Sequence, residues 1–354
     1  MGPRKPTRPE PRTGPCPRFH GRYKQAPEDF AVDEVPAYLP AGSGDHVWLW
    51  VEKRALSTID LLHELAAALD RDERSFGIAG LKDAQAVSRQ WVSIEHVDPA
   101  ACAGLRGDRF AVLDVRRHGN KLRMGHLRGN RFAITLRGTQ PGDLDLARGN
   151  LADLAKRGVP NWFGEQRFGK RGANLQKGLD VLRGDARAFA RKMPRRVFGL
   201  VASAVQSEVF NRVVNARAQQ LDRLLPGDLA FRHDNGSVFA VDDPAREQQR
   251  LDALQISPSG PMPGPEMIAP TGEPARIEAA ALAALDLAAD AFAALPFGLC
   301  RGERRPLRVP VSGAAAELVD GGLRVQFTLP KGAYATSVLR ELLTDTIWFG
   351  PNDD

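Results

Sequence analysis

Alternation between apolar and polar positions recurs near both ends of the chain and predicts β-strands there. In residues 131–138 (RFAITLRG), Phe132, Ile134 and Leu136 point one way along an extended chain. Residues 323–330 (LRVQFTLP) repeat the pattern, which is typical of an antiparallel sheet with one solvated face. Shorter apolar runs predict further strands at 28–35, 46–52 and 91–94, and a hairpin over 109–125 that turns at Gly119-Asn120.

Helical periodicity dominates the middle of the chain and also follows two of the predicted strands. Ser57 or Thr58 can cap a helix that ends near Leu69, and Thr336 can cap a final helix. The spacing of apolar residues predicts helices over 203–217 and 275–295, whereas proline and glycine predict a loop over 257–274.

Strand-rich sequence at both chain ends thus encloses a helix-rich middle. A chain of 354 residues exceeds what one hydrophobic core usually serves, so two domains are expected. The pattern predicts an α+β fold in which a sheet domain, built from both chain ends, is interrupted by an inserted domain.

Positive charge is unevenly distributed along the chain. Residues 1–26 hold seven basic side chains against Glu10, which equals the whole formal net charge of +6. Residues 101–137 carry nine basic against two acidic side chains, and residues 156–196 carry twelve against three. Residues 242–296 carry three against nine. Such segregation fits a bound polyanion such as nucleic acid, although solvated faces of alternating sign would give the same counts.

Several classes of protein are disfavoured by what the sequence lacks. No run of 18 apolar residues and no secretory signal is present, so we expect a cytoplasmic protein that does not span a membrane. Cys16, Cys102 and Cys300 lie far apart, and the histidines show no ligand spacing, so we expect neither a metal cofactor nor a disulfide framework.

Asp83 is the first candidate for chemistry. It lies in FGIAGLKDAQAVSRQW (76–91), just after a turn that contains Gly77 and Gly80, where a carboxylate can project into a cleft. The segment is not a phosphate-binding loop, because an aspartate follows Lys82 where Ser or Thr is required. On residue type alone, an aspartate at a turn more often caps the backbone than reacts.

Aromatic residues beside cations form the second candidate site. In VPNWFGEQRFGKRG (159–172), Asn161 and Phe163 lie close in sequence to the cations Arg167, Lys170 and Arg171, an arrangement that suits unstacked bases and phosphates. A core cluster at the entry of a helix would explain these residues equally well. Phe30, in EDFAVDE, and Tyr334, between a predicted strand and helix, would on their own be read as packing residues.

Four separated stretches resemble the TruD family of tRNA pseudouridine synthases. They are EDFAVDE (28–34), GLKDAQAVSRQW (80–91), NWFGEQRFG (161–169) and LPKGAYATSVLREL (329–342). RGNRFAITLRG (128–138) and SAVQSEVFNRVV (203–214) are also similar to the family. The resemblance runs from about residue 23 to about residue 345 in the family's order, which makes chance agreement implausible.

This resemblance implies an enzyme that isomerises uridine to pseudouridine, at position 13 of tRNA, without any cofactor. Asp83 matches the family's catalytic aspartate, Lys24 matches a basic residue beside that carboxylate, and Lys82 is expected to point elsewhere. Phe163 matches a ring that stacks on the target uracil, and further substrate-pocket positions are matched by Phe30, Asn161 and Tyr334. The tyrosine stands where the family usually has phenylalanine, so its hydroxyl needs a partner or water.

The same resemblance implies a domain plan. We expect a flexible basic tail over 1–22 and a pseudouridine synthase core over 23–185 and 309–354, with an antiparallel or mixed sheet and flanking helices. An inserted α/β domain specific to the family would span 186–308. The expected partner is tRNA, with no membrane and no nucleotide cofactor, and the expected state is a monomer.

Two other classes of function remain open at this stage. A non-catalytic RNA-binding protein or tRNA folding helper would keep the scaffold but would not need an acid pointing into a cleft made for phosphates. An N-glycosidase that releases uracil would need an activated water, and no second carboxylate stands at a telling spacing.

Overall fold

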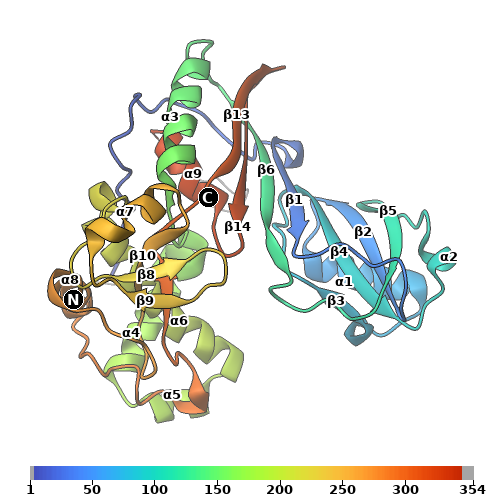
Figure 1. The fold of residues 1–354 in the computed structure, drawn as a ribbon. Helices are drawn as coiled ribbons and strands as arrows, with labels where there is room; N and C mark the ends of the chain where they lie inside the picture. Colours follow the sequence, from blue (N-terminus) through green and yellow to red (C-terminus); the bar gives the residue numbers. More distant parts are fainter. Residues whose placement is uncertain (1–3, 345–354) are drawn as a thin grey trace. The chain divides into compact units, whose positions relative to one another are not determined.

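The computed structural model describes residues 4–344, and these pack into two compact units (Figure 1). The first, called here the sheet unit, comprises 15–152, 311–335 and 342–344. The second, called here the helical unit, comprises 4–14, 153–310 and 336–341. Each unit is therefore assembled from stretches that lie far apart in the sequence, and mixed α and β structure is present as predicted.

The sheet unit is built on one mixed sheet, which has eight strands among the described residues. β1 pairs with β4 in parallel, with Val32 opposite Ser88, and all other pairs are antiparallel. The strand order is β13 (Ser312–Val319), β14 (Gly322–Pro330), β6 (Leu127–Arg137), β1 (Phe30–Pro36), β4 (Val87–Glu95), β2 (His46–Arg54) and β5 (Phe110–His118), with β3 (Phe76–Ile78) paired to β4.

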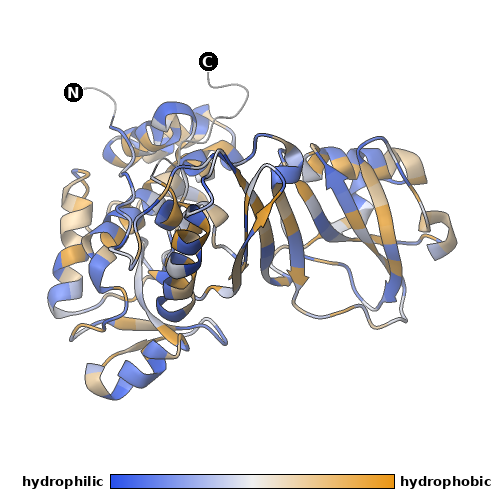
Figure 2. Ribbon diagram, turned by 90° about the horizontal axis from the view of Figure 1, so that it is seen from above, coloured by the Kyte–Doolittle hydropathy of each residue, from blue (hydrophilic) through white to orange (hydrophobic). Residues whose placement is uncertain are grey.

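Alternation along β14 buries one of its faces, as the pattern predicts, whereas β2 and β4 are buried on both faces along part of their length. In β14, Leu323, Val325, Phe327 and Leu329 are buried, and the residues between them are partly exposed. Figure 2 shows the matching alternation of hydrophobic and hydrophilic colour along the strands. Every second side chain of a strand points to the same face, so a short sequence repeat is enough to supply a core.

Helix α1 (Thr58–Leu69) covers part of the sheet. Its leucines, including Leu61 and Leu65, pack with Val47, Leu49 and Val51 of β2. The predicted cap is confirmed: the Ser57 side chain accepts a hydrogen bond from the Asp60 backbone N–H at 3.0 Å. A second, short helix, α2 (Pro99–Cys102), precedes β5.

The prediction of a hairpin over 109–125 is wrong. β5 pairs with β2, and β6 begins only at Leu127 and pairs with β1 and β14. The intervening loop is held by distant partners, because Trp48 Nε1 donates to the Asn120 carbonyl at 3.0 Å and the Leu122 N–H donates to Ser93 Oγ at 2.9 Å. Gly119-Asn120 therefore begins the loop that joins β5 to β6, and it is not a hairpin turn.

The helical unit surrounds the long helix α6 (Arg195–Ala216), which extends the helix predicted over 203–217. The helix α4 (Ala173–Arg183) approaches it so closely at Gly178 that an added Cβ would lie 2.2 Å from the Val201 carbonyl oxygen. The remaining helices are α3 (Asp143–Arg157), α5 (Ala186–Lys192), α7 (Pro244–Asp252), α8 (Gly272–Ala283) and α9 (Ala335–Leu342), of which α3 and α9 have residues in both units.

Four strands form the main sheet of the helical unit, in the order β11 (Glu303–Pro306), β10 (Ile256–Met262), β8 (Leu229–Arg232) and β9 (Val238–Ala240). A second ladder joins β7 (Val159–Pro160) to β12 (Arg308–Val309). Single 3₁₀ turns lie at Pro27–Asp29, Glu73–Ser75, Glu165–Phe168, Lys170–Gly172, Ala218–Gln220 and Pro296–Gly298.

Two predictions for the middle of the chain are wrong. The predicted loop over 257–274 begins as the buried strand β10, because its prolines still offer carbonyl groups: the Leu307 N–H donates to the Pro258 oxygen at 2.8 Å. The predicted helix over 275–295 ends at Ala283. Asp286 then adopts φ of +51°, a conformation that no α-helix continues through.

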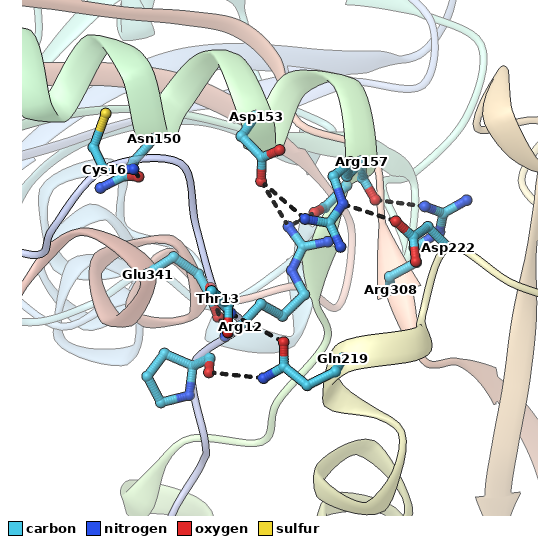
Figure 3. Close-up of polar contacts among 12 residues, drawn as sticks. Arg12, Thr13, Cys16, Asn150, Asp153, Arg157, Gln219, Asp222, Arg308 and Glu341 are labelled. Atoms are coloured by element: carbon cyan, nitrogen blue, oxygen red, sulfur yellow. Dashed lines mark hydrogen bonds and ion pairs between the residues drawn. The ribbon is translucent and has the colours of Figure 1, made fainter.

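The basic segment expected to be a flexible tail is held in place from residue 4 onward, so that expectation is wrong for the described part. The Thr7 N–H donates to the buried Glu208 carboxylate at 3.0 Å. Arg12 is buried, donates through Nη2 to the Gly158 carbonyl at 2.8 Å, and through its N–H to Glu341 Oε2 at 3.0 Å (Figure 3). Composition missed these contacts because the acceptors come from distant helices.

The later part of the same segment pairs within the sheet unit. The Arg22 N–H donates to the Arg137 carbonyl at 2.9 Å, and the Phe19 N–H donates to the Leu342 carbonyl at 3.0 Å. The predicted boundaries of a catalytic domain (23–185 and 309–354) and an inserted domain (186–308) stay a prediction. Within residues 4–344, no helix combines the length and apolar character needed to cross a bilayer.

One partly buried histidine makes the stability of the helical unit depend on pH. Burial, and to a smaller extent the charge of Arg308, lowers the pKa of His233 to about 4, while its Nε2 lies 2.9 Å from Ser257 Oγ. Between pH 6.5 and pH 4 the unfolded chain therefore binds a proton that the folded chain does not. We expect the free energy of unfolding to fall by about 2 kcal/mol from this group as pH drops through that window.

The matched variant is His233→Gln, which keeps a polar partner for Ser257 but does not titrate. Urea unfolding at several pH values should show a shallower loss of stability in the variant between pH 6.5 and pH 4. Equal slopes in the two proteins would contradict the assignment.

Candidate active site

Asp83 lies in the segment 79–86, which joins β3 to β4 and is fixed along its length. The Gly125 N–H donates to the Ala79 carbonyl at 2.8 Å, and the Lys82 N–H donates to Thr58 Oγ1 at 2.9 Å. The Gln85 N–H donates to Asp83 Oδ1 at 2.8 Å. The Asp83 side chain keeps 30% of its surface exposed, so a fixed carboxylate remains accessible to a reactant.

Lys24 forms an ion pair with Asp83, as the sequence comparison implied. Its ammonium donates to Asp83 Oδ2 and lies 4.5 Å from the centre of the Phe30 ring. The backbone at Lys24 has φ of +59°, a conformation that costs energy for any residue with a Cβ. The lysine is 6% exposed, so the cation is shielded from water while its carboxylate partner is not.

The Phe30 ring packs against the ammonium of this ion pair. Phe30 is the first residue of β1, it is buried, and its ring packs edge-on against Phe132 at 6.1 Å. The structure therefore brings Lys24, Phe30 and Asp83 together within the sheet unit.

Lys82 points away from Asp83, in agreement with the sequence-based expectation. Its Nζ donates to Glu34 Oε2 at 2.6 Å, and both side chains are almost completely buried. Burial raises the pKa of Glu34, and the charge of Lys82 opposes that rise. A buried ion pair thus anchors the segment that carries Asp83 to β1.

Lys53 is a neighbour of Asp83 that the sequence reading missed. It is fully buried, and its Nζ donates to the Asp83 carbonyl at 2.8 Å and to the Leu56 carbonyl. A signal was present in the sequence, because Val47, Leu49 and Val51 point inward along β2 and the next inward position is a lysine.

Asn161 and Phe163 come together in the helical unit around Arg305. The Arg305 guanidinium donates to Asn161 Oδ1 at 2.6 Å and lies 4.2 Å from the centre of the Phe163 ring. Asn161 Nδ2 donates to the Pro306 carbonyl at 2.9 Å, and Asn161 is 3% exposed. Phe163 is 7% exposed and contacts Phe210 edge-on.

Arg305 was not identified from the sequence, because it lies more than 140 positions from Asn161 and no local pattern marks it. Tyr334 belongs to the sheet unit, in the turn between β14 and α9, and is 41% exposed. Among residues 4–344, no group of histidine, cysteine or carboxylate side chains could hold a metal ion.

Comparison with known proteins gives a consistent result over most of the chain. The family model described as tRNA pseudouridine synthase D (TruD) matches residues 13–198 and 190–342. The tRNA pseudouridine synthase D of Geobacter sulfurreducens is 38% identical over 94% of this chain and 96% of its own length. That of Anaeromyxobacter dehalogenans strain 2CP-C is 44% identical over 93% of this chain and 95% of its own length.

A solved structure has the same fold. The crystal structure of a protein from Methanosarcina mazei, described as a putative tRNA pseudouridine synthase D, superposes with a TM-score of 0.77. The two sequences are 23% identical, and the match covers 94% of this chain and 95% of the other.

The buried ion pair of Lys82 and Glu34 is expected to affect stability. Replacing Lys82 with methionine leaves Glu34 buried without its cation, and we expect a loss of about 3 kcal/mol in the free energy of unfolding. The double variant Lys82→Met/Glu34→Gln removes both charges of this buried pair and should recover most of that loss. Urea unfolding of both variants checks this, and a double variant as unstable as the single one would contradict it.

Proposed function

Because the chain belongs to the TruD family of tRNA pseudouridine synthases, it isomerises uridine to pseudouridine in tRNA, and we propose that Asp83 is the group that reacts with the target nucleotide. The observation that carries this assignment is the ion pair of Lys24 with a fixed, accessible Asp83 carboxylate. We further propose position 13 of the tRNA as the site of modification. A non-catalytic tRNA-binding role finds no support in the comparisons.

The reaction needs a nucleophile or base and no redox partner. The bond from N1 to C1′ breaks, the uracil turns, and C5 joins C1′ while the proton lost from C5 is balanced by one gained at N1. An ionised Asp83 is suited to attack C1′ or C6, or to remove a proton from the sugar. Lys24 favours the charged carboxylate, because an opposite charge in contact stabilises the ionised form.

The residues around Arg305 are proposed to hold the substrate. The Phe163 ring is the proposed stacking surface. A base stacked on an aromatic ring can rotate in the plane of the base, which suits a uracil that must turn before it is rejoined. The guanidinium over the Phe163 ring is a planar cation that can stack on a base or bind a phosphate. Asn161 then acts by holding Arg305, since its side chain is engaged with Arg305 and with the Pro306 carbonyl.

Phe30 and Tyr334 are the other two positions proposed for the substrate pocket. Phe30 is buried and would act through Lys24, because its ring limits the positions open to the ammonium. Tyr334 offers an exposed ring to the RNA. Extruding a stacked uridine from folded tRNA costs a few kcal/mol, which contacts between basic segments and phosphates would offset. Monomeric action without a cofactor remains a prediction.

Asp83→Asn tests the nucleophile. With unmodified tRNA, we expect the rate of pseudouridine formation, mapped chemically, to fall at least about 1000-fold while tRNA affinity changes little. The exposed Asp108→Asn has the same change of charge and should behave as the wild type. Product from Asp83→Asn at the wild-type rate would exclude the assignment, and no product from the wild type on any tRNA would overturn the proposed function.

Lys24→Met tests the cation. Because the carboxylate loses its contacting charge, we expect single-turnover rates at pH 7 to fall by about 10- to 100-fold, and the acid limb of the pH–rate profile to move to higher pH. Turnover equal to the wild type across the profile would show that Lys24 has no part in the reaction.

A further inference from the structure

Lys53 occupies an unusual place at the end of an otherwise apolar stripe. Along β2, the inward positions Val47, Leu49 and Val51 are fully buried, and so is Lys53 at the next inward position. On β4, Val51 pairs with Gln90 and Lys53 pairs with Ser88. The inward face of the sheet therefore changes from apolar to polar at the end where Asp83 lies.

Burying the Lys53 ammonium costs more free energy than a purely structural role would require. Its ammonium donates to two backbone carbonyls, those of Leu56 and Asp83, and neither is a charged acceptor. Taking a cation out of water without an ionic partner in hydrogen-bond contact costs free energy that a methionine of similar length would not. Burial lowers the pKa of Lys53 to about 8, the Asp83 carboxylate raises it, and Lys82 lowers it further.

The charges around Lys53 single out Asp83 as its electrostatic partner. The ammonium of Lys82 is already paired with Glu34 of β1, and α1 contributes the neutral hydroxyl of Thr58. Lys24 pairs with Asp83 itself. Lys82 with Glu34 and Lys24 with Asp83 are pairs of opposite charge, so the excess positive charge near the Asp83 segment is that of Lys53, whose hydrogen-bond acceptors are backbone carbonyls.

We propose that Lys53 is a positioning residue for the reaction: it fixes the main chain at Asp83 and supplies, beside Lys24, a second positive charge that favours the ionised carboxylate. This rests on the proposed function of Asp83. Its two actions are separable, because a hydrogen bond to the carbonyl fixes geometry while the charge acts on the carboxylate through space.

Lys53→Met tests the role in full-length protein acting on unmodified tRNA. We expect tRNA affinity within about threefold of the wild type, a thermal midpoint equal to or above it, and a single-turnover rate at pH 7 lower by about 30-fold or more. The acid limb of the pH–rate profile should move to higher pH, because a charge that favours the carboxylate has been removed.

Two further variants separate position from charge. Lys53→Gln retains N–H donors without the charge, so it should lose less rate than Lys53→Met but show the same displacement of the acid limb. Lys82→Met/Glu34→Gln removes two opposite charges beneath the same segment, and its acid limb should stay at the wild-type pH.

The outcomes distinguish the proposals. An active wild type whose acid limb is unmoved in both Lys53 variants overturns the role of Lys53 and leaves the proposed function standing. If both variants lose cooperative unfolding, Lys53 is a folding residue and the proposal is also wrong. A wild type that forms no pseudouridine overturns the proposed function first, and the role of Lys53 with it.

Discussion

The ion pair between Lys24 and Asp83 is the interaction on which the rest of the site depends. In its proposed role the partly exposed Asp83 carboxylate acts in its charged form, which a contacting cation favours. The backbone at Lys24 takes a positive φ to reach it, Phe30 lies beneath the ammonium, and Gln85 fixes the carboxylate. A strained backbone at Lys24 and a fixed carboxylate at Asp83 thus meet in one ion pair. Strained residues of this kind are common at functional sites.

Much of the sheet unit could be predicted from the sequence, because strand alternation and helix caps are local signals. β14, β6 and α1 were found in this way. The pairing of Lys24 with Asp83 was reached only through resemblance to a family, since 59 positions separate them and no spacing rule connects them. The predicted 109–125 hairpin failed for the same reason: the partners of that loop, Trp48 and Ser93, are distant in sequence.

Lys53 and Arg305 were not predicted from the sequence, for two different reasons. Lys53 occupies the inward position of β2 that follows Val47, Leu49 and Val51, and the predicted strand over 46–52 ends before it. Arg305 reaches Asn161 through the arrangement of β11 and the segment after β7, which only the fold establishes. A polar residue can occupy a position that the apolar periodicity assigns to the core. Such a residue is therefore a candidate for function.

The parallel pairing of β1 with β4 has a consequence for folding. Parallel strands begin at the same edge, so the segments that precede them, carrying Lys24 and Asp83, meet whenever Val32 lies opposite Ser88. A slip of one residue would turn Phe30 and Glu34 to the opposite face and separate every partner at once. The Lys24–Asp83 ion pair is therefore a reporter of strand register: it forms only in chains that have closed this long-range contact correctly.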